Sequence, residues 1–150
     1  DDFEQAFSYF EHSLQLRKET LSDDNVLIAW AYFNSASVLT KMKETEKAIQ
    51  YYEEAIRRFL RINEIGICVP AYICIAEAYL DLNDCTKATN ALEQAFTYEY
   101  EYYGEENCRK YWLYDIKSKI LEKQGKNDEA AEYRRWSEEE YKKYIQSRET

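Results

Sequence analysis

The sequence predicts an all-α protein, a solenoid of about seven helices stacked as antiparallel pairs. Three observations predict it: a segment that repeats along the chain, a scarcity of helix breakers, and apolar residues at helical spacing. The copies of the repeated segment begin at Ala6, Ala48, Ala88 and, more weakly, Ala130, so they lie 42, 40 and 42 residues apart. A period of this size marks supersecondary units that bury their apolar faces only by stacking on one another. Binding is the class of function that such an array favours.

Glycine and proline are rare and occur only between the periodic segments. The chain has three glycines and one proline: Gly66 and Pro70 bracket one junction, while Gly104 and Gly125 each follow a periodic segment. Glycine is favoured just past a helix end and proline in the first turn of a helix. Helices are therefore expected over residues 2–21, 25–42, 45–64, 70–82, 85–103, 107–124 and 127–148, with Asn25, Asp84 and Asn127 as N-caps.

The first helix, residues 2–21, carries the degenerate copy of the repeat that begins at Ala6. In the later copies this segment forms the second helix of a pair, so here a second helix stands alone as a half repeat. We expect the chain to be a segment of a longer protein; the alternative is that the lone helix packs differently. His12, the one histidine, is expected to be a packed or surface residue of this helix rather than a general base.

The two central pairs place large and small residues at positions i, i+3, i+4 and i+7, the spacing of one helix face. The helices over residues 25–42 and 45–64 form one pair, and those over 70–82 and 85–103 the next. Alanines are expected where the antiparallel helices approach most closely, with larger side chains around them. The stripes of the first helices are Tyr32, Ser35, Ala36 and Leu39, then Tyr72, Ile75, Ala76 and Tyr79; those of the second helices are Ala48, Tyr52 and Ala55, then Ala88, Leu92 and Ala95.

The end of the helix over residues 85–103 has a second interpretation. Residues 98–103 read Tyr-Glu-Tyr-Glu-Tyr-Tyr, an alternation of period two that fits a strand or a tyrosine-phosphorylation target. Because the segment continues directly from a strong helical pattern, a longer, partly exposed helix is expected.

The last pair covers residues 107–124 and 127–148. Residues 134–143 are dense in charges of both signs, which is typical of a terminal capping helix with a solvated outer face. The alternative is a dimerisation helix that uses Tyr133, Trp136, Tyr141 and Tyr144. The repeats are thus expected at about 25–65, 69–104 and 107–149, after a half repeat over 1–21, in a single domain.

Charge and cysteine content limit the partners and the compartment. The net charge of -9 at pH 7 disfavours nucleic acid, whose phosphates are bound by clustered Lys and Arg. It favours basic or apolar protein partners; acidity that serves solubility alone is the alternative. No apolar run is long enough to cross a bilayer, so no membrane insertion is expected. No metal site is expected either, and reduced thiols in the cytoplasm are favoured, because the cysteines lack the paired spacing of a zinc site: Cys68, Cys74, Cys85 and Cys108.

Catalysis by these residues is not expected, and neither is a cofactor. The sequence has no glycine-rich phosphate loop, no recognisable pairing of a Ser or Cys nucleophile with histidine, and no HExxH spacing.

The pattern across each pair resembles the tetratricopeptide repeat. On the first helix a large residue is followed four positions later by a small one, and three positions after that by an aromatic residue or leucine. On the second helix an alanine is followed four positions later by an aromatic residue or leucine, and three positions after that by another alanine. The long period is similar to the kinesin light chain type, found also in some signalling and innate-immune proteins. Residues 32–36, Tyr-Phe-Asn-Ser-Ala, resemble that type's Leu-Asn-Asn-Leu-Ala, and residues 21–25 and 103–107 resemble its Leu-Gly-x-x-His junctions. Of the paired asparagines only Asn34 is present. The resemblance covers nearly the whole chain and implies a right-handed solenoid.

The resemblance also implies that the first helices line a concave groove. Trp30 and Trp112 are candidate anchors there, because rigid aromatic side chains bury much area at low entropic cost; packing between repeats is the alternative for each. The amide of Asn34 could hold a peptide backbone, since it both donates and accepts hydrogen bonds. The predicted groove residues are Trp30, Phe33, Asn34, Ser37 and Lys41, then Ile73, Glu77 and Asp81, then Trp112, Asp115, Lys119 and Glu122.

The function expected from these observations is a non-catalytic scaffold or adaptor that binds a partner peptide or helix in this groove. One alternative is a structural domain that self-associates, as a homodimer, through residues 2–21 or the last helix. The other is a regulatory segment of a larger enzyme or signalling receptor.

Overall fold

The computed structural model describes residues 2–104 and 110–149. Within these residues the chain forms seven α-helices and one turn of 3-10 helix, with no strand, which confirms the all-α class. The elements are α1 (Asp2–Thr20), α2 (Val26–Lys41), α3 (Thr45–Arg61), η1 (Ile65–Ile67), α4 (Cys68–Asp81), α5 (Cys85–Tyr103), α6 (Lys110–Lys123) and α7 (Asn127–Glu149).

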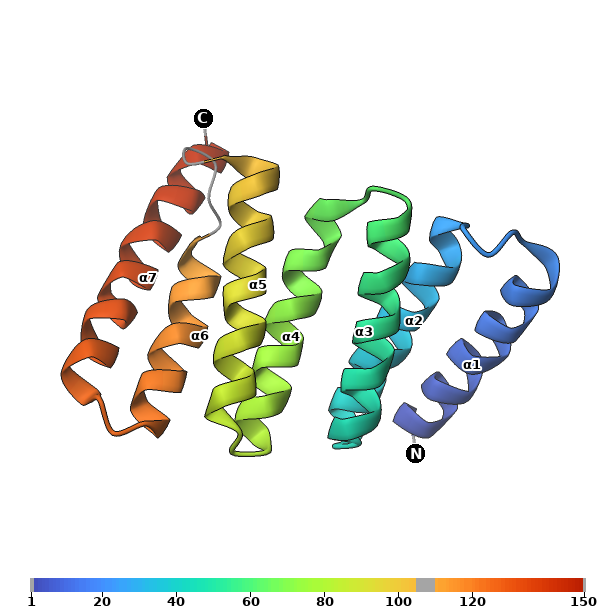
Figure 1. The fold of residues 1–150 in the computed structure, drawn as a ribbon, viewed down its shortest axis with the longest axis horizontal. Helices are drawn as coiled ribbons and strands as arrows, with labels where there is room; N and C mark the ends of the chain where they lie inside the picture. The colour runs from blue at the N-terminus through green and yellow to red at the C-terminus, as the bar shows by residue number, and fades with distance from the viewer. Residues whose placement is uncertain (1, 105–109, 150) are drawn as a thin grey trace.

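The helices stack side by side in chain order and form the expected solenoid (Figure 1). Packing is most extensive within the pairs α2/α3, α4/α5 and α6/α7. Successive pairs meet where α3 packs on α4 and α5 packs on α6, and α1 packs on α2 in the same way. Helix α1 therefore contacts the helix that follows it in the way that α3 and α5 do.

Two of the three expected N-caps are confirmed. The Asn25 side chain accepts a hydrogen bond from the backbone N–H of Leu27 at 2.9 Å, and Asp84 accepts one from the N–H of Lys87 at 3.0 Å. These bonds satisfy amides that have no partner inside the helix. The prediction for Asn127 is wrong by one position: α7 begins at Asn127 itself, and the carbonyl of Lys126 accepts from the N–H of Ala130.

Helix ends use glycine where the sequence has it, and other residues where it does not. Gly104 and Gly125 have φ of 70° and 76°, as expected for glycines past a helix end. At the ends of α2, α3 and α4 the same left-handed conformation falls on Lys43, Asn63 and Asn83. In each of these turns the next N–H bonds back across the last helical turn, for example Glu44 to the carbonyl of Leu39 at 3.0 Å, a Schellman motif.

The junction between α3 and α4 differs from the expected boundaries. Helix α3 ends at Arg61 instead of 64, and η1 leads into α4, which begins at Cys68 instead of 70. Pro70 thus lies inside the first turn of α4, where its missing N–H costs no helical hydrogen bond.

The loop between α1 and α2 is tied to α3 by a buried guanidinium. Arg58 donates to the carbonyl and the carboxylate of Asp23, both at 2.8 Å, and to Glu54 Oε1 at 2.6 Å. Its guanidinium carbon lies 5.2 Å from the ring centroid of Tyr32. Arg61 adds ion pairs to Asp23 and Asp24. Arg58 is one of few buried charged side chains in the described residues, and the carboxylates of Asp23 and Glu54 balance its positive charge.

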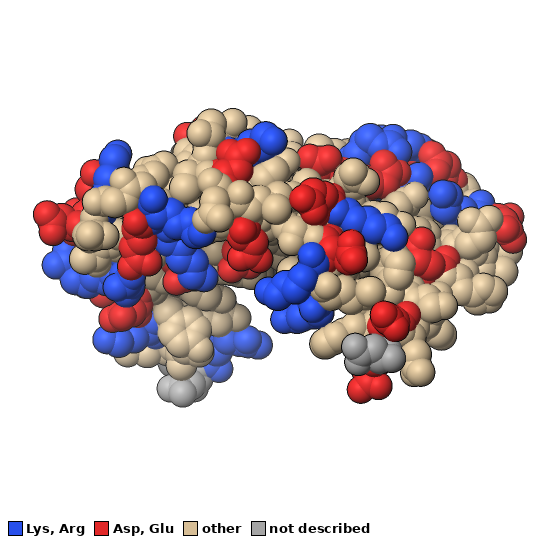
Figure 2. Space-filling view, turned by 90° about the horizontal axis from the view of Figure 1, so that it is seen from below, with Lys and Arg blue, Asp and Glu red and all other residues tan. Residues whose placement is uncertain are grey.

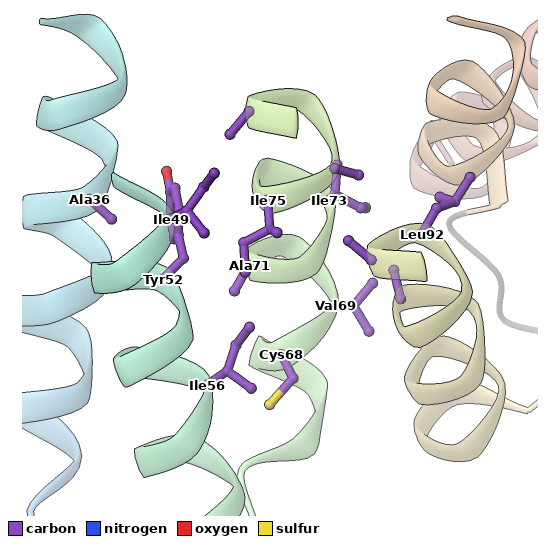
Figure 3. Packing of buried hydrophobic residues seen from close by; sticks show 14 of the residues in the cluster. Ala36, Ile49, Tyr52, Ile56, Cys68, Val69, Ala71, Ile73, Ile75 and Leu92 are labelled. Atoms are coloured by element: carbon purple, nitrogen blue, oxygen red, sulfur yellow. The ribbon is translucent and has the colours of Figure 1, made fainter. Parts of the chain in front are cut away.

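The core runs along the stack and its closest approaches fall on alanine, as predicted. Ala36 and Ala48 in one pair, and Ala76 and Ala88 in the next, are 0% exposed. Figure 3 shows Ile56 and Ile49 of α3 facing α4, while Ile73 projects from the other side of α4. The small residues let the backbones approach, and the larger ones fill the space between pairs.

Ala88→Leu should lower the free energy of unfolding by about 1–3 kcal/mol, because the three additional side-chain carbons cannot be placed at a fully buried contact without strain. Urea unfolding of the variant measures the loss. Thr86→Leu, at an exposed position on the same helix, is the matched control and should stay within about 0.5 kcal/mol of the parent. Equal stability of both variants would contradict this helix register.

Helix α5 extends to Tyr103, so the helical interpretation of residues 98–103 is confirmed over the strand. Aromatic residues of α7 contact tyrosines of α6, although Trp136 and Tyr141 remain exposed. Tyr133 and Trp136 lie 5.8 and 6.0 Å from the ring of Tyr114, and Tyr141 and Tyr144 lie 5.2 and 5.4 Å from the ring of Tyr111. These contacts favour the capping role, because rings engaged with α6 are less available to a second copy.

The cysteines in the described residues are free thiols. Burial raises the pKa of Cys68 to about 11 and raises that of Cys74 as well, so neither is a reactive thiolate near neutral pH. Cys108 lies outside the described residues.

Candidate binding surfaces

A groove crosses the first helices of the three pairs. Its volume is about 450 Å³ and side chains of α2, α4 and α6 line it. Four of the predicted groove residues meet here: Glu77 and Asp81 from α4, and Lys119 and Glu122 from α6. Seen from the end of the helices, one long side of the molecule is hollowed, with acidic and basic side chains around the hollow (Figure 2). We call this surface the first-helix groove.

An ion-pair chain joins α4 to α6 across the first-helix groove. Lys119 Nζ lies 2.7 Å from Asp115 Oδ2 and 3.5 Å from Glu77 Oε1. Burial alone would lower the pKa of Lys119, but these two carboxylates outweigh it and raise the pKa. The lysine therefore stays charged and holds the two helices at a defined spacing.

Not every charged side chain in the first-helix groove has an ion-pair partner among the described residues. Glu122 pairs with Arg134 of α7, and Lys123 donates to the Asn83 side chain at 2.6 Å. Asp81 is exposed and forms no ion pair with any described residue. Among the charged residues that line the groove, Asp81 and Lys123 are thus the two without an ion pair in the described residues.

The aromatic residues predicted on α2 are engaged with one another and with α3. Trp30 lies edge-on to Phe59 at 5.3 Å and to Phe33 at 5.7 Å, and Phe33 lies 5.4 Å from Tyr52. Trp30 nevertheless keeps 37% of its surface exposed. It is thus both a packing residue and an accessible aromatic side chain.

The polar residues predicted on α2 remain accessible. Ser37 and Lys41 are exposed and Asn34 is half-buried. Among the described residues, the side-chain amide of Asn34 forms no hydrogen bond, so its N–H donors and its oxygen acceptor are available to a ligand.

Two predicted residues lie deeper than a groove residue should. Ile73 is 1% exposed and belongs to the core, so the prediction that it faces a partner is wrong. Trp112 is half-buried and, with Val69 and Ile73, borders a cavity of about 10 Å³. The physical reason is that α6 packs against α4 and covers Ile73. Phe33 holds the equivalent position on α2 and stays half-buried.

Sequence reasoning missed the polar floor of the groove. Thr40 and Cys74 line it, and the phenol of the buried Tyr52 interacts with both from α3. Burial is the largest cause of the raised pKa of Tyr52, and the neighbouring Cys74 raises it further, so this hydroxyl stays protonated as a donor. No sequence signal marked it, because Tyr52 belongs to a second helix and reaches the groove only between α2 and α4.

A second hollow, which sequence reasoning also missed, lies on the opposite side of α4. Its volume is about 510 Å³. Three helices line it, each with one face: Glu53, Ile56, Arg57 and Leu60 of α3, Tyr72, Ile75 and Tyr79 of α4, and Lys87, Asn90, Ala91 and Gln94 of α5. We call it the second-helix slot.

Neither a metal centre nor a membrane span emerges from the described residues. No group of three or more His, Cys, Asp or Glu side chains there could hold a metal ion, and no helix there is long and apolar enough to cross a bilayer.

Comparisons with known proteins agree with this geometry. Residues 1–61 match the family model described as tetratricopeptide repeat. The crystal structure of BtubC (BKLC) from P. vanneervenii superposes with a TM-score of 0.82 at 16% sequence identity, over 96% of this chain. The present chain spans 58% of the BtubC chain. No curated protein sequence matches the chain. The family model thus covers α1 to α3, and the superposition shows that the fold of BtubC extends over nearly all of this chain.

Proposed function

We propose that this tetratricopeptide-type repeat protein is a non-catalytic interaction module that holds a segment of a partner protein in the first-helix groove, as a scaffold or adaptor in the cytoplasm. Repeats of this type generally mediate protein–protein interaction, which makes a protein partner the natural ligand. The observation that carries the proposal is a groove of about 450 Å³ that side chains of three successive first helices line.

The chemistry of the groove favours a basic or apolar partner segment. Of the three carboxylates that line the groove, Asp81 is the one without an ion pair among the described residues, and it would take a lysine or arginine of the partner. Trp30 offers exposed aromatic surface, and Asn34 can pair with the partner's backbone. We propose that the remaining predicted residues shape the groove or border it: Phe33, Ser37, Lys41, Glu77, Trp112, Asp115, Lys119 and Glu122.

Asn34→Ala combined with Asp81→Lys tests the proposal, since both side chains are accessible and neither supports the core. Proteins retained from a cell lysate by the parent should be lost with this double variant, and purified partner should bind at least tenfold more weakly. The matched control is Gln50→Ala with Glu101→Lys, which makes the same kinds of change at exposed positions of α3 and α5 and should retain the partners. Equal retention by both variants would place binding elsewhere and reject the groove.

Self-association through α1 or α7 is the competing function. The exposed Phe3, Tyr9 and Leu16 of α1 favour it. Sedimentation at increasing protein concentration distinguishes the two, because only self-association raises the measured mass.

A further inference from the structure

The second-helix slot is best understood by comparing three equivalent junctions of the solenoid. With repeat offsets of 40 and 42 residues, Tyr51 of α3, Ala91 of α5 and Tyr133 of α7 occupy the same position. Tyr51 packs edge-on to Tyr32 of α2, with ring centroids 5.6 Å apart and an interplanar angle of 64°. Tyr133 packs on Tyr114 of α6 at 5.8 Å and the same angle of 64°. The first and last junctions are therefore filled by a tyrosine in one geometry.

The middle junction has the tyrosine of the first helix but lacks the tyrosine of the second helix. Tyr72 stands where the other junctions have Tyr32 and Tyr114, and Ala91 replaces the tyrosine. Both Tyr72 and Ala91 line the second-helix slot. The hollow of about 510 Å³ thus lies where the neighbouring repeats bury a phenol ring.

The polar partners of the first junction are also conserved in the slot. There Tyr51 donates its hydroxyl to Glu11 Oε2 at 3.0 Å, and Lys47 Nζ lies 5.9 Å from its ring centroid. The repeat offsets place Glu53 in the position of Glu11 and Lys87 in that of Lys47, and both line the slot.

The two conserved charges are placed to receive a ring. Glu53 is exposed, and its carboxylate forms no hydrogen bond with another described residue. Lys87 sits over the ring of Tyr79 at 5.3 Å and 3.4 Å from Asp84 Oδ2, so its ammonium already lies beside the slot. An acceptor and a cation that serve a tyrosine in one repeat are therefore both present in the next.

The other neighbour of Tyr72 is in place as well. Tyr98 stacks on Tyr72, with centroids 5.5 Å apart and planes 10° from parallel. At the equivalent position of the preceding repeat, Arg58 lies over Tyr32. Tyr72 thus has an aromatic neighbour, Tyr98, at the position from which Arg58 contacts Tyr32.

We infer that the second-helix slot is a binding site for a tyrosine side chain presented by a partner protein. The incoming ring would pack edge-on to Tyr72 over Ile56, Ile75 and Ala91, donate its hydroxyl to Glu53 and lie beside the ammonium of Lys87. Phenylalanine lacks the hydroxyl donor for Glu53, so the site distinguishes tyrosine from phenylalanine. The site lies on the other side of α4 from the first-helix groove and is independent of the function proposed for it.

Ala91→Tyr is the decisive variant, because it supplies the missing ring from the protein itself. The probe is N-acetyl-tyrosinamide, followed by the shifts of backbone amide signals in two-dimensional NMR spectra. With the parent protein, amides of the residues that line the slot should shift saturably at millimolar concentration, as a ligand of this size permits. In Ala91→Tyr these shifts should vanish, and the melting temperature should rise by roughly 2–4 °C.

Two comparisons test the chemistry of recognition. N-acetyl-phenylalaninamide should bind the parent several-fold more weakly, and Glu53→Ala should abolish that preference. Gln50→Ala, an exposed α3 change outside the slot, should alter neither probe. The inference is overturned if the slot amides do not saturate, if Ala91→Tyr binds the probe like the parent, or if the two probes bind the parent equally. Asn34→Ala with Asp81→Lys should leave the probe shifts unchanged, whatever becomes of the first-helix groove.

Discussion

Phe59→Ala should lower the free energy of unfolding by about 3–5 kcal/mol, a large share of the total stability of a domain this size. Phe59 is 0% exposed and belongs to the central core. Its ring lies 5.3 Å from that of Trp30, so truncation leaves a cavity between α2 and α3 and removes the support of Trp30. Because packing in a solenoid is local, the neighbouring pairs cannot collapse readily into the space.

Urea unfolding followed by circular dichroism measures this loss, and Trp30 fluorescence reports the local change. Leu60→Ala is the matched control, since Leu60 is the next residue of α3 and is 38% exposed. It should cost about 1 kcal/mol or less. A loss below about 1.5 kcal/mol for Phe59→Ala would contradict the burial of this ring.

Arg58→Met should cost about 2–4 kcal/mol, because it removes a buried cation together with its charge-assisted hydrogen bonds to Asp23 and Glu54. Methionine keeps the length and the apolar stem of the side chain, so the loss reports the guanidinium. The Arg58 side chain is 9% exposed and engages both Asp23 and Glu54. Arg57→Met is the matched control: Arg57 pairs with Glu54 as well, but its side chain is 56% exposed, and surface pairs contribute about 0–1 kcal/mol. Equal losses for the two variants would show that burial of Arg58 does not matter.

The same network makes the stability depend on pH in a defined direction. Hydrogen bonds from Arg58 and Arg61 hold the pKa of Asp23 below its usual 3.8. Burial raises the pKa of Glu54, but hydrogen bonds from Arg57 and Arg58 outweigh it and lower the pKa from the usual 4.5. Carboxylates with lowered pKa stabilise the fold above their unfolded pKa and lose that contribution as the pH falls through the folded pKa.

Unfolding at pH 7 and at successive values below 4 tests the direction. The stability gap between the parent protein and Arg58→Met should be full at pH 7 and should narrow below about pH 4, as Asp23 and Glu54 take up protons. A gap that stays constant to pH 3 would mean that these carboxylates do not depend on Arg58.

Much of the fold could be predicted because its signals are local. Helical spacing, breakers between segments and the recurring alanines are properties of consecutive residues, and they predicted all seven helices and the four fully buried alanines. Helix ends without glycine were harder, as at Lys43, because positive φ there follows from hydrogen bonds across the turn. Asn127 shows the same limit at a helix start.

The candidate site was harder to predict because exposure depends on the neighbouring repeats. Phe33 and Ile73 hold equivalent positions, yet Phe33 is half-buried and Ile73 fully buried, since α6 packs on α4. Tyr52 and Cys74 come together only where α3 of one pair packs on α4 of the next.

The sequence by itself determined the helices, their pairing and the solenoid fold, because the period of an α-helix and the length of a repeat are both properties of the order of residues. Only the tertiary structure decided which side chains stay accessible, which charges are paired, and that the change from Tyr51 to Ala91 leaves a slot instead of a collapsed junction. The physical reason is that rigid neighbouring helices keep their spacing when one side chain is small, and that spacing is a property of the whole stack.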